Sequence, residues 1–314
     1  MNKLHHQWDR LSCLSSSSVG QTFLSVPFSR RSFLAASVAA LSLPAMAEAS
    51  PWQIGCFTRP WDAFDYRVGL DGIAEAGFRY VGLMTAKAPR SIIVTPDVPE
   101  AEVQEIAAEI KQRKLTVVSV YGGNIAIDKS LRDGIDSLKR LIDRCAMVGC
   151  QNLMMGGVGS PQLYDNYFKA IAECCGYAAD KHMGISMKPH GGLNATGAQC
   201  RKAVERVNHP NFRIWYDPGN IFYYSDGKLD PVDDAPSVDG LVAGVSIKDF
   251  KLPKEVLLTP GDGQVNFPKV LALLKKGGFN KGPLVIETLR TGDAKQMTAE
   301  AMRAREFVES VVKP

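Results

Sequence analysis

Residues 116–155 read TVVSVYGGNIAIDKSLRDGIDSLKRLIDRCAMVGCQNLMM and contain one complete structural unit. The short apolar runs at its two ends, Thr116–Tyr121 and Asn152–Met155, are typical of buried strands. Between them, Leu131–Val148 carries apolar side chains at helical spacing and stops at Gly149, which predicts an amphipathic helix. A strand, a helix and a second strand in this order favour two parallel strands joined by a crossover helix.

The same alternation continues on both sides of this unit. Eight strand–helix repeats in about 265 residues, without a linker or low-complexity break, predict one (β/α)8 barrel domain over residues 50–314. An open doubly wound sheet would be expected to carry a phosphate-binding glycine loop after its first strand, and GCFTRPW at 55–61 has none. The other expected strands are Gln53–Phe57, Tyr80–Met84, Ile185–Met187, Phe212–Tyr216, Leu241–Ile247 and Leu284–Ile286, and further expected helices include Pro99–Arg113, Leu163–Lys181, Ala198–Val207, Pro268–Lys276 and Thr298–Val312.

The first 49 residues have the pattern of a targeting segment. Arg30-Arg31 precede a short apolar stretch and the small residues Ala45-Met46-Ala47, which predicts a cleaved twin-arginine signal peptide and leader. The apolar stretch is shorter than the ~20 residues that cross a bilayer, which argues against a membrane anchor. We therefore expect export to the periplasm or another extracytoplasmic space, with no membrane association after cleavage.

The charge of the chain depends on this leader. The whole sequence has 37 Lys and Arg against 33 Asp and Glu, a net charge of +4. Residues 1–47 hold four of the basic and one of the acidic residues, which leaves a net charge of +1 after cleavage. A nearly neutral protein gives no electrostatic case for binding nucleic acid or an anionic membrane.

The cysteines show no paired spacing of the kind that zinc sites use. Cys13 lies in the leader, and Cys145, Cys174 and Cys175 fall within helical patterns, where we expect them to pack as small apolar residues. Disulfides after export are neither required nor excluded by this pattern.

Polar residues that could take part in catalysis lie at the ends of four consecutive expected strands. In a barrel of this kind the catalytic groups lie at the carboxyl ends of the strands. Each residue has an ordinary explanation when taken alone, such as a turn residue or a solvated ion pair, but the barrel would bring all of them into one bowl. They are Lys188 and His190 in MGISMKPHGG, Asp217 and Asn220 in RIWYDPGN, Ser246 and Lys248 in VSIKDF, and Glu287 in LVIET.

The order of these motifs resembles the sugar phosphate isomerase/epimerase family, which are xylose-isomerase-like TIM barrels in a superfamily that also holds endonuclease IV-type enzymes. The resemblance covers residues 52–313. It implies a divalent metal held by Glu, Asp, His and Glu at the ends of strands five to eight. Asp217 and Glu287 match the second and fourth of these ligands, whereas Lys188 and Ser246 stand where the glutamate of strand five and the histidine of strand seven are expected.

Two interpretations of the cofactor follow from this partial match. In the first, which we prefer, the Lys188 ammonium supplies the positive charge that relatives obtain from a metal. In the second, a divalent metal (Mn, Co, Zn or Mg) is retained on His190, Asp217 and Glu287. A Schiff base on Lys188 is a rival mechanism, although two neighbouring carboxylates would raise the pKa of this lysine rather than lower it.

The resemblance implies a small carbohydrate or polyol as the substrate. The expected chemistry is proton abstraction next to a carbonyl, as in an isomerase, an epimerase or a lyase. The expected catalytic residues are Lys188 as the electrostatic group, Asp217 and Glu287 as bases, and His190 as acid or base. A sugar-binding barrel without catalysis is the alternative, and the oligomeric state stays open. Expected substrate-binding residues are Trp61 and Tyr223 as stacking aromatics, Asn220, Ser246 and Lys248 at strand ends, and Asp262 in the Gly261–Gly263 loop.

Overall fold

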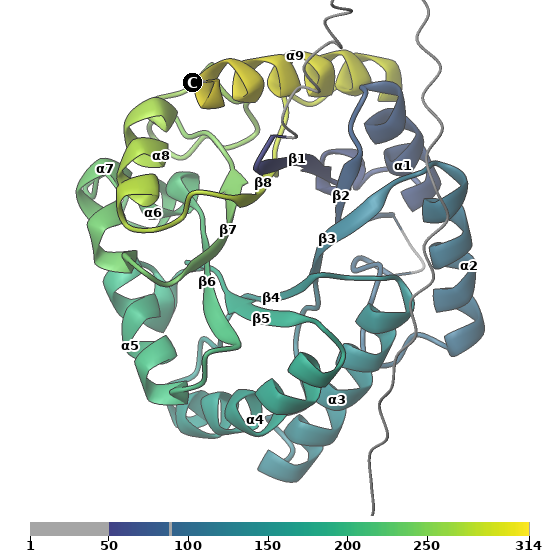
Figure 1. Ribbon diagram of the computed structural model, residues 1–314, viewed down its shortest axis with the longest axis vertical. Coiled ribbons are helices and arrows are strands. Elements are labelled where there is room, and N and C mark those ends of the chain that lie inside the picture. Colours follow the sequence, from purple (N-terminus) through teal and green to yellow (C-terminus); the bar gives the residue numbers. More distant parts are fainter. Residues whose placement is uncertain (1–49, 88–89, 314) are drawn as a thin grey trace, which may run out of the picture. The chain divides into compact units, whose positions relative to one another are not determined.

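The structure, a computed structural model, describes residues 50–87 and 90–313. Within them eight parallel strands close into a barrel in chain order, with β1 beside β8 (Figure 1). This arrangement confirms the (β/α)8 barrel expected from the alternating pattern. The strands are β1 (Trp52–Phe57), β2 (Tyr80–Leu83), β3 (Thr116–Tyr121), β4 (Asn152–Met155), β5 (Gly184–Met187), β6 (Phe212–Tyr216), β7 (Val242–Ile247) and β8 (Gly282–Ile286).

Helices connect successive strands and form a ring outside the barrel (Figure 1). The longer ones are amphipathic and contribute their buried apolar residues to the core. The helices are α1 (Tyr66–Glu75), α2 (Glu100–Gln112), α3 (Leu131–Met147), α4 (Pro161–Asp180), α5 (Gly197–Val207), α6 (Pro218–Tyr224), α7 (Pro231–Asp234), α8 (Phe267–Lys276) and α9 (Ala294–Val312), with the 3-10 turns η1 (Arg59–Trp61), η2 (Gly192–Asn194) and η3 (Ala235–Val238).

Two large aromatic side chains fill the inside of the barrel and form the floor of its mouth. Phe57 on β1 and Trp215 on β6 are fully buried, and their rings meet edge to face with centroids 6.1 Å apart. Glycines on the adjacent strands make room for both rings. A Cβ at Gly82 would come within 2.1 Å of the Phe57 ring, and one at Gly244 within 2.5 Å of the Trp215 ring. A side chain at either glycine would therefore disrupt the interior packing.

The cysteines of the described residues are buried and free, Cys145, Cys174 and Cys175 among them. Their predicted role as small apolar packing residues is confirmed. The predicted signal peptide and leader over residues 1–49 lie outside the described residues, so export stays a prediction. Within residues 50–87 and 90–313, no helix is both long enough and apolar enough to span a membrane.

Candidate active site

The turn after β6 is built from Asp217-Pro218-Gly219-Asn220, and each residue has a local reason. Asp217 caps α6, with its Oδ1 accepting a hydrogen bond from the Asn220 amide at 2.8 Å. Pro218 occupies the first helical turn, where a missing N–H costs nothing. A Cβ at Gly219 would lie 2.6 Å from the Lys248 carbonyl oxygen, so only glycine lets β6 and β7 approach this closely.

Asn220 joins three strand ends. Its Nδ2 donates to the Pro189 carbonyl at 2.7 Å, and its Oδ1 accepts from the Lys248 ammonium at 2.8 Å. Because Asn220 is itself fixed through Asp217, the ends of β5, β6 and β7 are held together by this one side chain. The sequence-predicted Asn220 and Lys248 are therefore brought into contact.

Lys188 lies buried between two carboxylates at the centre of the barrel mouth. The residue is 1% exposed. Its Nζ is 2.9 Å from Asp217 Oδ2 and forms a second ion pair with Glu287 Oε2. A buried ammonium needs charged partners of this kind to offset its lost hydration. The predicted meeting of Lys188, Asp217 and Glu287 is thus found in the structure.

Glu287 is the acceptor on which most of the site converges. Its Oε2 accepts from Lys188 and from the Ser246 hydroxyl at 2.7 Å, and its Oε1 accepts from Lys248 at 3.2 Å and from Arg59 at 3.5 Å. Ser246 in turn accepts a hydrogen bond from the indole N–H of Trp215 at 3.1 Å. The floor of the barrel and the charged cluster are therefore one connected network.

The pKa values follow from this arrangement. Burial alone would lower the pKa of Lys188, but Asp217 and Glu287 outweigh it and raise that pKa above its ordinary value. Burial would raise the pKa of Glu287, yet Lys188, Lys248 and Arg59 hold it well below its ordinary value. Burial lowers the pKa of Lys248 below its ordinary value, and the nearby cations Lys188 and Arg59 lower it further. The carboxylates of Glu287 and Asp217 offset only part of this decrease. Glu287 is therefore firmly ionised.

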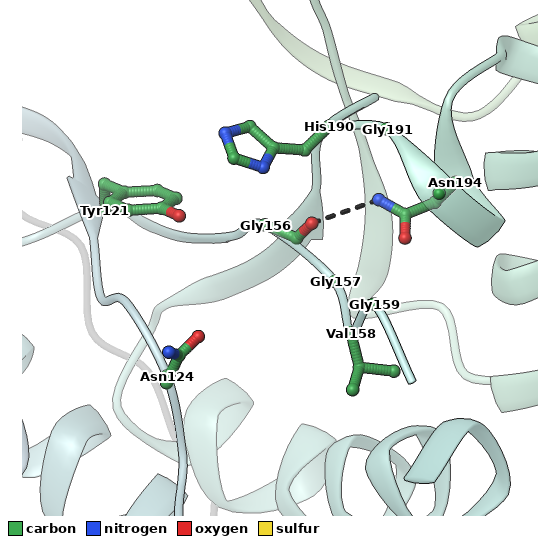
Figure 2. Close-up of a pocket in the computed structure, with 10 residues that line it drawn as sticks. Tyr121, Asn124, Gly156, Gly157, Val158, Gly159, His190, Gly191 and Asn194 are labelled. Carbon is green, nitrogen blue, oxygen red and sulfur yellow. Dashed lines mark hydrogen bonds between the residues drawn. The ribbon is translucent and has the colours of Figure 1, made fainter. Parts of the chain in front are cut away.

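A pocket of about 270 Å³ opens over the ends of β3, β4 and β5 beside this cluster (Figure 2). No charged carboxylate, lysine or arginine lines it. His190 exposes part of its surface to this pocket, while burial of the rest and the nearby Lys188 ammonium lower the pKa of His190 to about 4. The imidazole is therefore neutral at physiological pH. The lining residues are Tyr121, Asn124, Gly156, Gly157, Val158, Gly159, His190, Gly191, Gly192 and Asn194.

Asp249, next to Lys248, faces away from the charged cluster and organises the Gly261–Gly263 loop. Its buried carboxylate accepts hydrogen bonds from the backbone N–H groups of Phe250, Gly261, Gly263 and Val265. A Cβ at Gly263 would lie 2.2 Å from Asp249 Oδ1, so the loop needs glycine there. Four backbone donors satisfy this carboxylate without help from a side-chain cation.

The comparison with protein families decides the classification. The family described as xylose isomerase-like TIM barrel matches residues 70–308 of this chain. The chain belongs to the xylose isomerase-like TIM barrel family.

Solved structures of similar fold include sugar epimerases. A xylose isomerase domain protein from Planctomyces limnophilus is 20% identical, with a TM-score of 0.64 over 83% of this chain and 97% of the other. D-psicose 3-epimerase from Clostridium cellulolyticum H10 is 14% identical, with a TM-score of 0.66 over 83% and 100%. D-allulose 3-epimerase from Methylomonas sp. is 17% identical, with a TM-score of 0.63 over 83% and 98%. No significant match was found among curated proteins.

The metal that the resemblance to xylose isomerase-like barrels implied does not fit the residues of this chain. The Lys188 ammonium binds both carboxylates, Asp217 and Glu287, that would serve as ligands. The His190 ring lies against Tyr121 and Tyr224 instead of completing a donor set. In the described part of the chain, no group of three or more His, Cys, Asp or Glu side chains is placed to hold a metal ion. A divalent cation could bind these carboxylates only by displacing the Lys188 ammonium, which is part of the chain.

Three of the expected substrate-binding residues lie away from the Lys188 cluster of this xylose isomerase-like barrel. Trp61 is 1% exposed and packs against α1, where a Cβ at Gly72 would meet its ring at 2.7 Å. Tyr223 lies under the Lys254 ammonium, 5.1 Å from its ring centroid. Asp262 pairs with Arg303 at 2.7 Å and with Arg290 at 3.5 Å.

Three further residues belong to the site although the sequence did not single them out. Arg59 follows β1 and contacts Glu287. Tyr224, one position after the expected Tyr223, places its ring 5.7 Å from that of His190. Asn194 donates to the carbonyls of Gly156 and Lys188 at 3.0 and 3.2 Å and so ties β4 to β5 (Figure 2). The only available signal for Arg59 was its place in the polar pair Thr58-Arg59 that follows β1.

Proposed function

We propose that this protein isomerises or epimerises a small carbohydrate by moving a proton on a carbon next to a carbonyl, with two lysines in the place of a resident metal. The observation that carries the proposal is the Glu287 carboxylate, which bridges the ammonium groups of Lys188 and Lys248. The sugar epimerases among the structural neighbours support the reaction class. The chemistry of the site supports the role of the lysines.

The hydrogen-bond donors of Lys188 and Lys248 suggest that both lysines bind an oxygen atom of the substrate. Each ammonium has three N–H donors. Within the described residues, Lys188 donates to Glu287 and forms an ion pair with Asp217, whereas Lys248 donates to both Asn220 and Glu287. One donor of each ammonium therefore remains for an oxygen atom of the substrate. Two fixed cationic donors in a site of low dielectric stabilise a negatively charged oxygen as it develops.

The proton transfer is best assigned to His190. Glu287 is a weak base because Arg59, Lys188, Lys248 and Ser246 all donate to it. His190 is neutral, exposed to the pocket and therefore able to accept a proton.

In the proposed reaction, His190 takes the proton from the carbon next to the carbonyl. The electrons of the C–H bond form the enediolate double bond, and those of the carbonyl π bond move to its oxygen, which the two ammonium groups hold. Return of this proton to the former carbonyl carbon, with transfer of the neighbouring hydroxyl proton to the former carbonyl oxygen, gives the isomer. Protonation of the original carbon on its opposite face by water, with release of the first proton from His190 to solvent, gives the epimer. Burial raises the pKa of Tyr121, so its hydroxyl in the same pocket stays protonated and can donate.

The pocket lining suits a polyhydroxylated ligand. It combines the amides of Asn124 and Asn194 with the Tyr121 hydroxyl and with glycine backbone on two loops. Backbone and amide groups of this kind pair well with sugar hydroxyls, and glycine lets a ligand approach the main chain closely.

The test of the proposed function is exchange of substrate hydrogen with solvent. The protein is incubated in D2O with D-fructose, D-allulose and D-tagatose, and deuterium incorporation is followed by NMR. We expect exchange next to the carbonyl of at least one ketose, at a rate unchanged by dialysis against EDTA. Loss of exchange on chelation with recovery on adding Mn²⁺ would contradict the role of the lysines. Saturable binding without exchange would favour the sugar-binding alternative.

The exchange rate should depend on pH through His190. Because the pKa of His190 is lowered to about 4, the ring is the neutral base above that pH and is lost as a base below it. We expect a level rate between about pH 6 and pH 8 and a fall as the pH approaches 4. His190→Asn should abolish exchange at every pH, whereas His182→Asn, at an exposed residue on the α4–β5 turn, should not change it. A wild-type midpoint near an ordinary histidine pKa of about 6.5 would refute the assignment.

A further inference from the structure

We infer that Arg59 binds a carboxylate of the substrate, so that the preferred ligands are sugar acids rather than neutral sugars. This inference rests on the proposed function, because it places the charged end of the substrate beside the proposed oxyanion donors. Arg59 is the first residue of η1 and lies two positions after the last residue of β1, and neither the sequence motifs nor the family match assigns it a role.

The charges of the cluster do not balance. Arg59, Lys188 and Lys248 carry three positive charges, and Asp217 and Glu287 carry two negative charges. The adjacent Asp249 does not correct the difference, since its carboxylate is bound by four backbone N–H groups of its own loop. One positive charge is left over in a region where four of these five side chains are buried.

The surplus falls on Arg59, which is partly exposed, and a bound ligand that displaces water from this cation is favoured if it carries a charge of opposite sign. A surplus of one matches the single negative charge of a carboxylate. A phosphate dianion would overshoot this surplus and make the occupied site negative. Charge complementarity therefore favours a monoanion.

Arg59 is the cation that a ligand can reach. Its side chain is 26% exposed, and its contact with Glu287 is a long one, 3.5 Å from Nη1 to Oε1. Glu287 does not need Arg59, because Lys188, Lys248 and Ser246 already donate to it. Among the described residues the guanidinium has no other acceptor, so most of its donors can make a planar, two-point contact, which is the geometry that carboxylates accept best.

The position of Arg59 also sets where a bound carboxylate would lie relative to the chemistry. Arg59 and Lys248 meet at Oε1 of Glu287, and Lys188 binds Oε2 of the same group. A ligand carboxylate bound to Arg59 would therefore lie close to both proposed oxyanion donors, Lys188 and Lys248, because all three cations contact the same carboxylate of Glu287. The neutral pocket at β3–β5, which His190 lines, would receive the hydroxylated part of the same molecule.

The experiment compares three ligands that share one ring and differ at one carbon: D-glucuronate, D-glucose and D-glucose 6-phosphate. Affinities are measured by isothermal titration calorimetry on the full chain. We expect D-glucuronate to bind at least about tenfold more tightly than D-glucose, with a preference that shrinks as salt is added. Arg59→Gln should remove this preference, and Arg59→Lys should keep part of it. The control Arg132→Gln, at an exposed arginine that also pairs with one carboxylate, should leave it unchanged.

Equal affinity for D-glucuronate and D-glucose, no binding of D-glucuronate, or a preference that survives Arg59→Gln would each overturn the assignment. Tighter binding of D-glucose 6-phosphate than of D-glucuronate would overturn the choice of a monoanion. Binding needs no turnover, so this result is independent of the exchange experiment. An Arg59-dependent preference without hydrogen exchange would sustain the anion site and reject the proposed reaction.

Discussion

Lys188→Met should lower the rate of hydrogen exchange by about 100- to 1,000-fold, which is the usual cost of losing one oxyanion donor. Methionine is one atom shorter than lysine but keeps an unbranched chain of similar volume, and it removes the charge and the donors. The developing oxyanion would then face Lys248 alone. NMR in D2O measures the rate directly, and Lys269→Met, at an exposed lysine of α8, should leave it unchanged.

A loss of activity in Lys188→Met must be separated from a loss of folding, because the substitution leaves Asp217 and Glu287 without their shared ammonium. Circular dichroism and urea unfolding establish whether the variant is folded. If it is not, the double variant Lys188→Met/Asp217→Asn removes one charge of each sign and so keeps the net charge of the wild-type cluster. A folded variant with the wild-type rate would show that Lys188 has no catalytic role.

Glu287→Gln should lower the free energy of unfolding by about 3–5 kcal/mol at neutral pH, as expected when one partner of a buried ion network is removed. Three cations would then share the single carboxylate of Asp217, and the Ser246 hydroxyl would lose a charged acceptor. Urea unfolding followed by circular dichroism measures the difference. The control Glu100→Gln removes an exposed ion pair with Arg144 and should cost under about 1 kcal/mol.

The stabilisation by Glu287 should depend on pH in a defined direction. The pKa of Glu287 in the folded protein is well below its ordinary value, and in the unfolded chain it is about 4.3. Its contribution is therefore complete above the unfolded pKa and is lost as the pH falls through the folded one. The difference between wild type and Glu287→Gln should be largest near neutrality and shrink below about pH 4. An equal difference at every pH would contradict this account.

The barrel and its charged cluster were predictable from sequence for a simple reason. Strands and helices are local patterns, and the carboxyl ends of parallel strands meet at one place. Lys188, Asp217 and Glu287 directly follow the last residues of β5, β6 and β8, so the topology alone brings them together. Side chains one residue beyond a strand are fixed by the barrel rather than by a loop.

The residues whose positions could not be predicted from the sequence depend on how a helix is rotated about its axis or on the conformation of a loop. Tyr223 and Tyr224 are adjacent in α6, and the phase of the helix, set by its cap at Asp217, decides which of them faces His190. Trp61 lies in η1, two residues after Arg59, and turns into the groove that Gly72 of α1 leaves open. The position of Asp262 depends on the loop that Asp249 organises, and three of the backbone groups that donate to Asp249 are distant from it in the sequence.

The central cation of the site, the Lys188 ammonium, is part of the polypeptide and is not taken up from the surroundings. A metal site is filled according to the concentration of the ion outside and can be emptied by a competitor. The Lys188 ammonium is synthesised with the polypeptide, so it has no dissociation constant and every folded molecule carries one. On the proposed function, the fraction of active molecules would be the same in metal-poor and metal-rich surroundings.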